Sequence, residues 1–278
     1  MHSITFGSGP VGERGAAVPG EPRESALGPV KPAGFSDAVR FEWLKLRSMK
    51  STMYSLLGAA ILIIGPGILS AMMMKPTVSK AMAFTIVFGG MFVGQIVLCV
   101  SGALAVTAEY GSGTIQSTFL AVPRRGRLLA AKVLTVFTLW TVAGLAITAV
   151  TYVLGRALLP REILLPGLWD ATVLRTVIGG AVFIGFQAVF CLALGMLIRT
   201  SAGAITAGVC FVLVLPTLMG VMGVEAFTKA WPTERGKEIF SPAAVDGIIS
   251  SFGGLIYFCV FTIALFSCAL LWVRHRDV

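Results

Sequence analysis

Residues 173–197 read VLRTVIGGAVFIGFQAVFCLALGML, an apolar run whose one charged residue, Arg175, lies near its start. Only a helix or a closed barrel satisfies the backbone inside a bilayer, and about 20 helical residues cross its hydrocarbon core of about 30 Å. The run is too long and unbroken for a barrel strand. Five similar runs occupy residues 53–74, 83–106, 133–155, 202–224 and 252–273. The sequence therefore predicts an all-α membrane protein with six transmembrane helices.

The composition agrees with a chain that lies almost entirely in or beside lipid. Of the 278 residues, 56% are hydrophobic and 13% are charged, and the formal net charge is +9. The basic residues sit in short segments beside the apolar runs, which indicates topology determinants and contacts with membrane lipid rather than a nucleic-acid surface. The cysteines fall within the apolar runs, and the two histidines lie at opposite ends of the chain. We therefore expect no metal site and no cofactor.

Basic residues near the apolar runs predict the orientation of the chain. Six crossings put both termini on one side of the membrane. That side carries eleven basic residues near the apolar runs, namely Arg40, Lys45, Arg47, Lys50, Arg124, Arg125, Arg127, Lys132, Arg199, Arg274 and Arg276. The other side carries eight, namely Lys75, Lys80, Arg156, Arg161, Arg175, Lys229, Arg235 and Lys237. Because cytoplasmic loops are enriched in Lys and Arg, both termini are predicted to be cytoplasmic.

The chain before the first apolar run falls into two parts. Residues 1–35 are rich in Gly and Pro and are predicted to be a disordered cytoplasmic tail. Residues 36–50 are predicted to form a cytoplasmic interfacial helix, because apolar residues recur there at helical spacing among basic ones. The alternative is that they are the frayed start of the first spanning helix. We expect the six-helix domain to cover residues 36–278.

Small residues and prolines suggest how the helices pack. Gly90 with Gly94, and Ala204 with Gly208, form small-xxx-small pairs that allow close helix contact, either within one subunit or across a dimer. Pro216 interrupts the fifth run. In the outer loop before the sixth run, residues 241–249 are predicted to form a short helix that dips into the outer interface or re-enters the membrane; a solvated loop is the alternative.

A polar segment between the second and third runs has the pattern of a short amphipathic helix. Ser112 or Thr114 can cap it, and Pro123 stops it. Its apolar face carries Ile115, Phe119 and Val122. That face must be buried, either against the membrane surface or in a groove of a partner protein.

This segment resembles the permease subunits of type-2 ATP-binding-cassette (ABC) exporters. Members of that family typically carry a Glu, then Gly-Thr, then Pro followed by Arg, then a Lys at the mouth of the third helix. The matching positions are Glu109, Gly113, Thr114, Pro123, Arg124, Arg125 and Lys132. The helix layout extends the resemblance to residues 36–278.

The resemblance implies that residues 112–122 form a coupling helix that docks on a cytoplasmic ATPase subunit. Phe119 and Ile115 would fill an apolar groove of that subunit, and the basic cluster after Pro123 would contact acidic residues or lipid phosphates. The residues expected to bind the partner are Glu109, Gly113, Thr114, Ile115, Phe119, Val122, Pro123, Arg124, Arg125 and Arg127.

Two charged residues beside this segment carry specific expectations. Glu109 lies at the negative end of the second helix's dipole, so a cation should pair with it, and a nearby arginine is the natural candidate. The alternative is a solvated carboxylate at the interface. Lys132 is expected to anchor the inner end of the third helix by extending its side chain toward the headgroups.

The sequence contains no phosphate-binding loop of the type GxxxxGK[ST], so we expect the chain not to be an enzyme. It also places no Asp, Glu, His or Lys well inside an apolar run, as ion-coupled carriers and intramembrane enzymes require. Gln95 and Gln187 are the most polar long side chains at depth. We expect them to form hydrogen bonds between helices, and the alternative is contact with substrate.

The expected function is that of a permease subunit of an ABC transporter in the cell membrane of a bacterium. It would export a hydrophobic or amphipathic substrate, such as a drug or antibiotic, with energy from the separate ATPase. Since six helices are half of the usual complement, a second permease chain, identical or homologous, should complete the pathway. The alternatives are a flippase for lipids or large amphiphiles, and a membrane sensor or assembly protein without transport.

Overall fold

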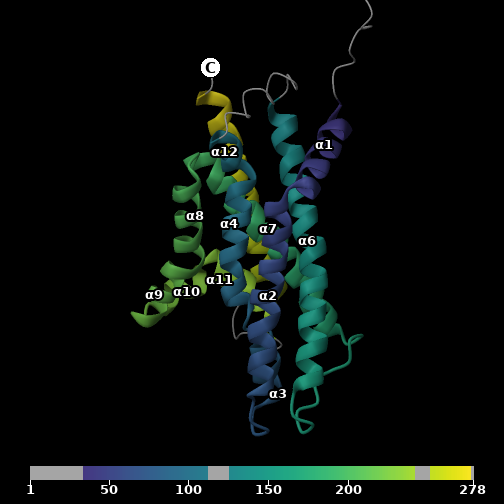
Figure 1. The fold of residues 1–278 in the computed structure, drawn as a ribbon. Helices are drawn as coiled ribbons and strands as arrows, with labels where there is room; N and C mark the ends of the chain where they lie inside the picture. Colours follow the sequence, from purple (N-terminus) through teal and green to yellow (C-terminus); the bar gives the residue numbers. More distant parts are fainter. Residues whose placement is uncertain (1–33, 112–124, 242–250, 277–278) are drawn as a thin grey trace, which may run out of the picture. The chain divides into compact units, whose positions relative to one another are not determined.

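The computed structural model describes residues 34–111, 125–241 and 251–276, which all belong to one unit, Ala33–Val278. These residues are helical almost throughout and contain no strand. In chain order (Figure 1) the elements are α1 (Phe35–Ser48), α2 (Lys50–Met72), α3 (Lys80–Val87), α4 (Met91–Gly111), α6 (Arg125–Leu158), α7 (Ala171–Ile198), α8 (Ser201–Val209), the π-helical turn η1 (Cys210–Val214), α9 (Leu215–Val221), α10 (Glu225–Ala230), α11 (Pro232–Lys237), the 3₁₀ turn η2 (Glu238–Phe240) and α12 (Ser251–Arg276).

Six helical segments are long and apolar enough to cross a membrane. They are Lys50–Met72, Lys80–Gly111, Gly126–Leu158, Ala171–Ile198, Ser201–Val221 and Phe252–Val273. The prediction of an all-α membrane protein with six transmembrane helices is therefore confirmed. Two spans are composite, because α3 and α4 together make the second and α8, η1 and α9 make the fifth.

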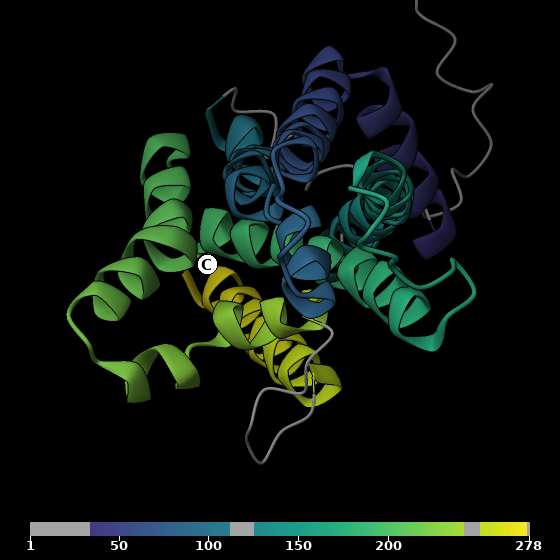
Figure 2. The ribbon, with the colours of Figure 1, turned by 90° about the horizontal axis from the view of Figure 1, so that it is seen from below.

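The helix α7 lies at the centre of the bundle (Figure 2). In its most apolar window 72% of the residues are buried inside the protein, the largest share among the six spans. Glycines let its neighbours approach closely. A Cβ atom on Gly102 of α4 would lie 2.3 Å from the carbonyl oxygen of Ala188 in α7, and one on Gly185 would lie 2.1 Å from Thr141 Oγ1 of α6. The backbone of α7 thus lies directly against the backbone of α4 and against side chains of α6.

The two small-xxx-small pairs pack within this one chain. A Cβ atom on Gly90 would lie 1.9 Å from the carbonyl oxygen of Ile63, and one on Gly94 would lie 2.2 Å from the Ile63 side chain. On α8, Gly208 lies against Cys99 and Cys191, and Ala204 is fully buried. Both pairs therefore serve packing inside the subunit.

The helix α1 is distinct from α2, since Met49 between them has extended backbone angles of φ −80° and ψ 120°. It packs against α6 through the side that carries Ala38 and Glu42, its two buried residues. Large apolar side chains on the rest of its surface are exposed, including Phe41 and Leu44. An exposed apolar side suits lipid contact, but its place at the cytoplasmic interface stays a prediction.

The fifth span changes from α to π geometry at η1, just before Pro216. The carbonyl of Phe211 in this turn accepts a hydrogen bond of 2.8 Å from Trp231 Nε1. Residues 225–240 then form α10, which packs against α9, and α11 and η2, which pack against α7 and α12. The predicted short helix at 241–249 lies outside the described residues apart from Ser241, as does the predicted tail apart from Gly34 and Phe35.

Candidate functional site

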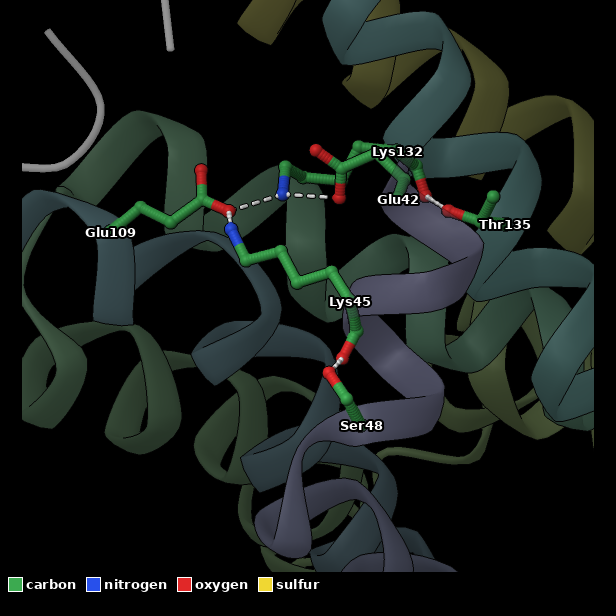
Figure 3. A network of polar contacts seen from close by, with 6 residues as sticks. All are labelled: Glu42, Lys45, Ser48, Glu109, Lys132 and Thr135. Carbon is green, nitrogen blue, oxygen red and sulfur yellow. Dashed lines mark hydrogen bonds and ion pairs between the residues drawn. The ribbon is translucent and has the colours of Figure 1, made fainter. Parts of the chain in front are cut away.

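Four charged side chains meet near one end of the bundle, where α1, α4 and α6 come together (Figure 3). Glu42 and Lys45 belong to α1, Glu109 lies two residues before the end of α4, and Lys132 lies two turns inside α6. We call these four residues the charge network. It joins residues that are up to 90 positions apart in the chain.

Lys132 is the centre of the charge network. Its Nζ lies 2.9 Å from Glu42 Oε2 and 2.5 Å from Glu109 Oε1. Lys45 Nζ pairs with the same Glu109 oxygen. The side chains of Lys132 and Glu42 are only 3% and 1% exposed, so bulk solvent stabilises neither charge. A buried charge of this kind is stable only when an opposite charge and hydrogen bonds compensate it, which makes each member dependent on the others.

Local sequence explains why these four side chains converge. Glu42 and Lys45 are three residues apart on α1, so they project from the same side of that helix. Glu109 occupies the negative end of the α4 dipole, where two lysines offset the unfavourable interaction. The hydroxyl of Thr135 donates a hydrogen bond of 2.9 Å to the backbone carbonyl of Lys132.

The same end of α4 also contacts the turn between α7 and α8. Ser201 Oγ donates a hydrogen bond of 2.9 Å to Thr107 Oγ1, and the Arg199 guanidinium lies 5.6 Å from the centre of the Tyr110 ring. Arg199 has a left-handed backbone (φ 63°) that ends α7 and lets α8 begin at once. The end of α4 is therefore connected on one side to α1 and α6, and on the other to α7 and α8.

A cavity of about 210 Å³ borders the charge network between α1, α2, α4 and α6. All four members of the charge network line it. Its remaining walls are apolar or carry hydroxyl groups, and Trp140 Nε1 closes one side by donating a hydrogen bond of 3.1 Å to Ser101 Oγ. The site thus combines fixed charges with space for an apolar group.

Comparison with known proteins decides the family. The family model described as "ABC-2 family transporter protein" matches residues 38–217, which is more than half of the chain. The chain belongs to the ABC-2 transporter family. The matched region includes all four residues of the charge network, whereas α10, α11 and α12 lie beyond it. A search of curated proteins finds no match.

Membership in the ABC-2 family bears on several expectations. It makes this chain a membrane-spanning component of an ABC transporter, and it implies partnership with an ABC ATPase subunit. The family is a transport component that is not itself catalytic. The similarity to an ABC-2 permease inferred from the sequence is confirmed.

The structure describes only part of the predicted partner-binding segment of this ABC-2 protein. Glu109 has cationic partners, as predicted, but those that the described residues supply are the lysines Lys45 and Lys132, and the predicted pairing with an arginine stays a prediction. The prediction that Lys132 extends toward the headgroups is wrong, because its ammonium is buried between two carboxylates. Arg127 is exposed on the first turn of α6. The structure does not describe the side chain of Arg125. The other predicted residues lie wholly outside the described ranges, namely Gly113, Thr114, Ile115, Phe119, Val122, Pro123 and Arg124.

The two glutamines at depth are both fully buried, Gln95 in α4 and Gln187 in α7. The expectation that they form hydrogen bonds between helices is wrong for this conformation, because neither amide has a hydrogen-bond partner among the described residues. Their role in a substrate pathway stays a prediction.

Sequence reasoning missed Glu42 and assigned no role to Lys45 beyond topology. The helical pattern of α1 drew attention to its apolar residues, and two of these, Phe35 and Trp43, are exposed. One feature could have revealed Glu42. It is the only acidic residue in the basic stretch from Arg40 to Lys50, and it lies four residues after the small Ala38 on the same face of the helix.

Proposed function

We propose that this chain is the permease subunit of an ABC exporter, with both termini in the cytoplasm of a bacterial cell. A separate ATPase docks on residues 112–122, and its cycle of ATP binding and hydrolysis drives export of a hydrophobic or amphipathic substrate. A second permease chain, identical or homologous, completes the pathway. Family membership and the long apolar helices support this proposal.

The observation that carries the proposal is the ion pair between Glu109 and Lys132. The predicted docking segment leaves α4 at Gly111 and returns to α6 at Arg125. The Glu109–Lys132 pair ties these two helices together just behind the segment. A force applied to the segment would therefore move α4 and α6 as a unit instead of separating them.

The rest of the charge network extends this connection to α1. Glu42 and Lys45 attach that helix to the pair, while Ser201 and Arg199 attach the α7–α8 turn to the end of α4. Movement at the docking segment would thus reach four of the six spans together with α1. This is the arrangement that a permease driven by an external ATPase needs, because such a chain holds no energy source of its own.

The first test concerns docking at Phe119. Phe119→Asp puts a charge in the proposed apolar contact, so we expect the amount of ATPase that co-purifies with the permease to fall at least about tenfold. Ser117→Asp is the matched control. It adds the same charge about 200° away around the helix and should leave co-purification unchanged. Equal recovery of the ATPase with wild type and Phe119→Asp would disprove the coupling role of this face.

The second test concerns orientation. In a variant whose native cysteines are replaced, Gly126→Cys at the start of the third span should react with an impermeant maleimide only from the cytoplasmic side. Lys229→Cys in α10 is the opposite marker and should react only from outside. Labelling is measured in intact cells and in inverted vesicles. The reverse pattern would place the docking segment outside the cell and end the proposal.

A further inference from the structure

The cavity beside the charge network has the chemistry of a site for an amphiphile. Leu104, Val136 and Leu139 provide apolar wall, while Ser51, Ser55 and Ser101 provide hydroxyl groups. The charge network forms its polar end. A ligand that fills this space must therefore have an apolar body and a polar head.

A second cavity of about 230 Å³ adjoins the first, because Leu46, Thr52 and Leu139 line both. It lies at the corner between α1 and α2, and Trp43 and Met53 on its wall are exposed. Neighbouring α1 side chains Phe41 and Leu44 are exposed as well. Apolar residues that line both cavities thus connect the charge network to the exposed apolar surface of α1 and α2, from which an acyl chain would approach.

The polar end of the cavity favours a zwitterionic head over a charged one. The two lysines and two glutamates of the charge network carry equal and opposite formal charges, and Arg47 lines only the adjoining second cavity. An anionic head would lie close to two carboxylates, and a simple cation close to two ammonium groups. A head that carries both signs can place each sign beside its opposite.

One atom of the charge network indicates what the head must supply. Glu42 Oε1 has no hydrogen-bond partner among the described residues, although Glu42 is almost fully buried. Figure 3 shows that Lys132 bonds the other oxygen of the carboxylate. An unpaired carboxylate oxygen is costly and attracts an N–H donor, above all a cationic one. A primary ammonium meets this need, whereas a trimethylammonium group has no N–H to donate.

We propose that this cavity binds an ethanolamine phospholipid of the cytoplasmic leaflet. The ammonium of the lipid donates a hydrogen bond to Glu42 Oε1, and its phosphate accepts from Lys45 and the nearby serine hydroxyls. One acyl chain follows the apolar walls to the surface of α1 and α2. The bound lipid fastens α1 to α4 and α6. This inference goes beyond the proposed function and does not depend on the ATPase; only its choice of the cytoplasmic leaflet rests on the proposed orientation.

The test uses the purified full-length permease in detergent micelles and counts retained lipids by native mass spectrometry. The probes are phosphatidylethanolamine, its N-monomethyl and N,N-dimethyl forms, phosphatidylcholine and phosphatidylglycerol, all with the same acyl chains. We expect the first three to be retained and phosphatidylcholine to bind about tenfold more weakly, because it lacks the N–H donor. Phosphatidylglycerol should bind as weakly as phosphatidylcholine.

Two variants locate the site without changing any charge. Ala105→Leu enlarges a side chain that lines the cavity, and we expect it to lower retention of phosphatidylethanolamine to the level of phosphatidylcholine. Ala202→Leu makes the same change on the exposed side of α8 and should retain the lipid as wild type does. Equal retention of phosphatidylcholine, preference for phosphatidylglycerol, or unchanged binding in Ala105→Leu would each overturn the proposal.

Discussion

Replacing Lys132 by methionine is expected to destabilise the protein by about 3–5 kcal/mol, the usual cost of leaving a buried charge without its partner. Lys132 is the only cationic partner of Glu42 among the described residues, and both side chains are almost fully buried. The change should appear as a lower unfolding temperature of the purified protein. It should also abolish ATP-driven transport in proteoliposomes, because α4 and α6 are no longer tied behind the docking segment.

Two further variants make this prediction specific. Lys229→Met breaks an ion pair with Glu225 whose side chains are 65% and 77% exposed, so it should leave the unfolding temperature close to that of wild type. Adding Glu42→Gln to Lys132→Met removes the uncompensated carboxylate and should recover most of the lost stability without restoring transport. If Lys132→Met unfolds at the wild-type temperature, the charge network is not the compensated buried cluster described above.

Gly90→Ala is expected to have the second largest effect, a loss of stability of about 3 kcal/mol. A Cβ atom at this position would lie 1.9 Å from the carbonyl oxygen of Ile63 and 2.7 Å from its carbonyl carbon. Those atoms belong to the backbone of α2 and cannot rotate away, so the contact between α2 and α4 must open. The unfolding temperature of the purified variant measures this cost.

Gly58→Ala is the matched control for Gly90→Ala. It makes the same change in α2, where a Cβ atom would come no closer than 4.0 Å, to a side-chain atom of Val97. Because alanine also favours the helix more than glycine does, the stability should stay equal or rise slightly. Equal losses in the two variants would mean that chain flexibility, and not the approach of α2, explains the need for glycine at position 90.

The sequence was sufficient for the six spans because hydrophobic length is a local property of about 20 consecutive residues. It was less exact at the ends of helices. The third apolar run was placed at 133–155, whereas α6 covers Arg125–Leu158. The extra turns at its start contain Arg127 and Lys132, which an apolar criterion leaves out although they continue the helix.

The charge network could be predicted only in part, because it depends on pairing between distant residues. Helix-dipole reasoning showed that Glu109 needs a cation. It could not show that one lysine would come from α1 and the other from α6, since that depends on how three helices meet. The burial of Glu42 also reverses what is usual in soluble proteins, where a helix buries its apolar side and exposes its charged side. When lipid surrounds the bundle, the apolar side of α1 is free to face outward and a compensated polar side can face the other helices.

The π-helical turn η1 has a consequence for the fifth span as a whole. Its hydrogen bond from the Leu215 amide to the Cys210 carbonyl encloses one residue more than an α-helical turn does. Each residue of an α-helix adds about 100° of rotation, so everything after the turn is offset by about that angle from an uninterrupted helix. A homologue one residue shorter within 210–214 would continue as an uninterrupted α-helix and would still present the same side of 215–221 to its surroundings, because the lost residue and the lost π turn offset one another.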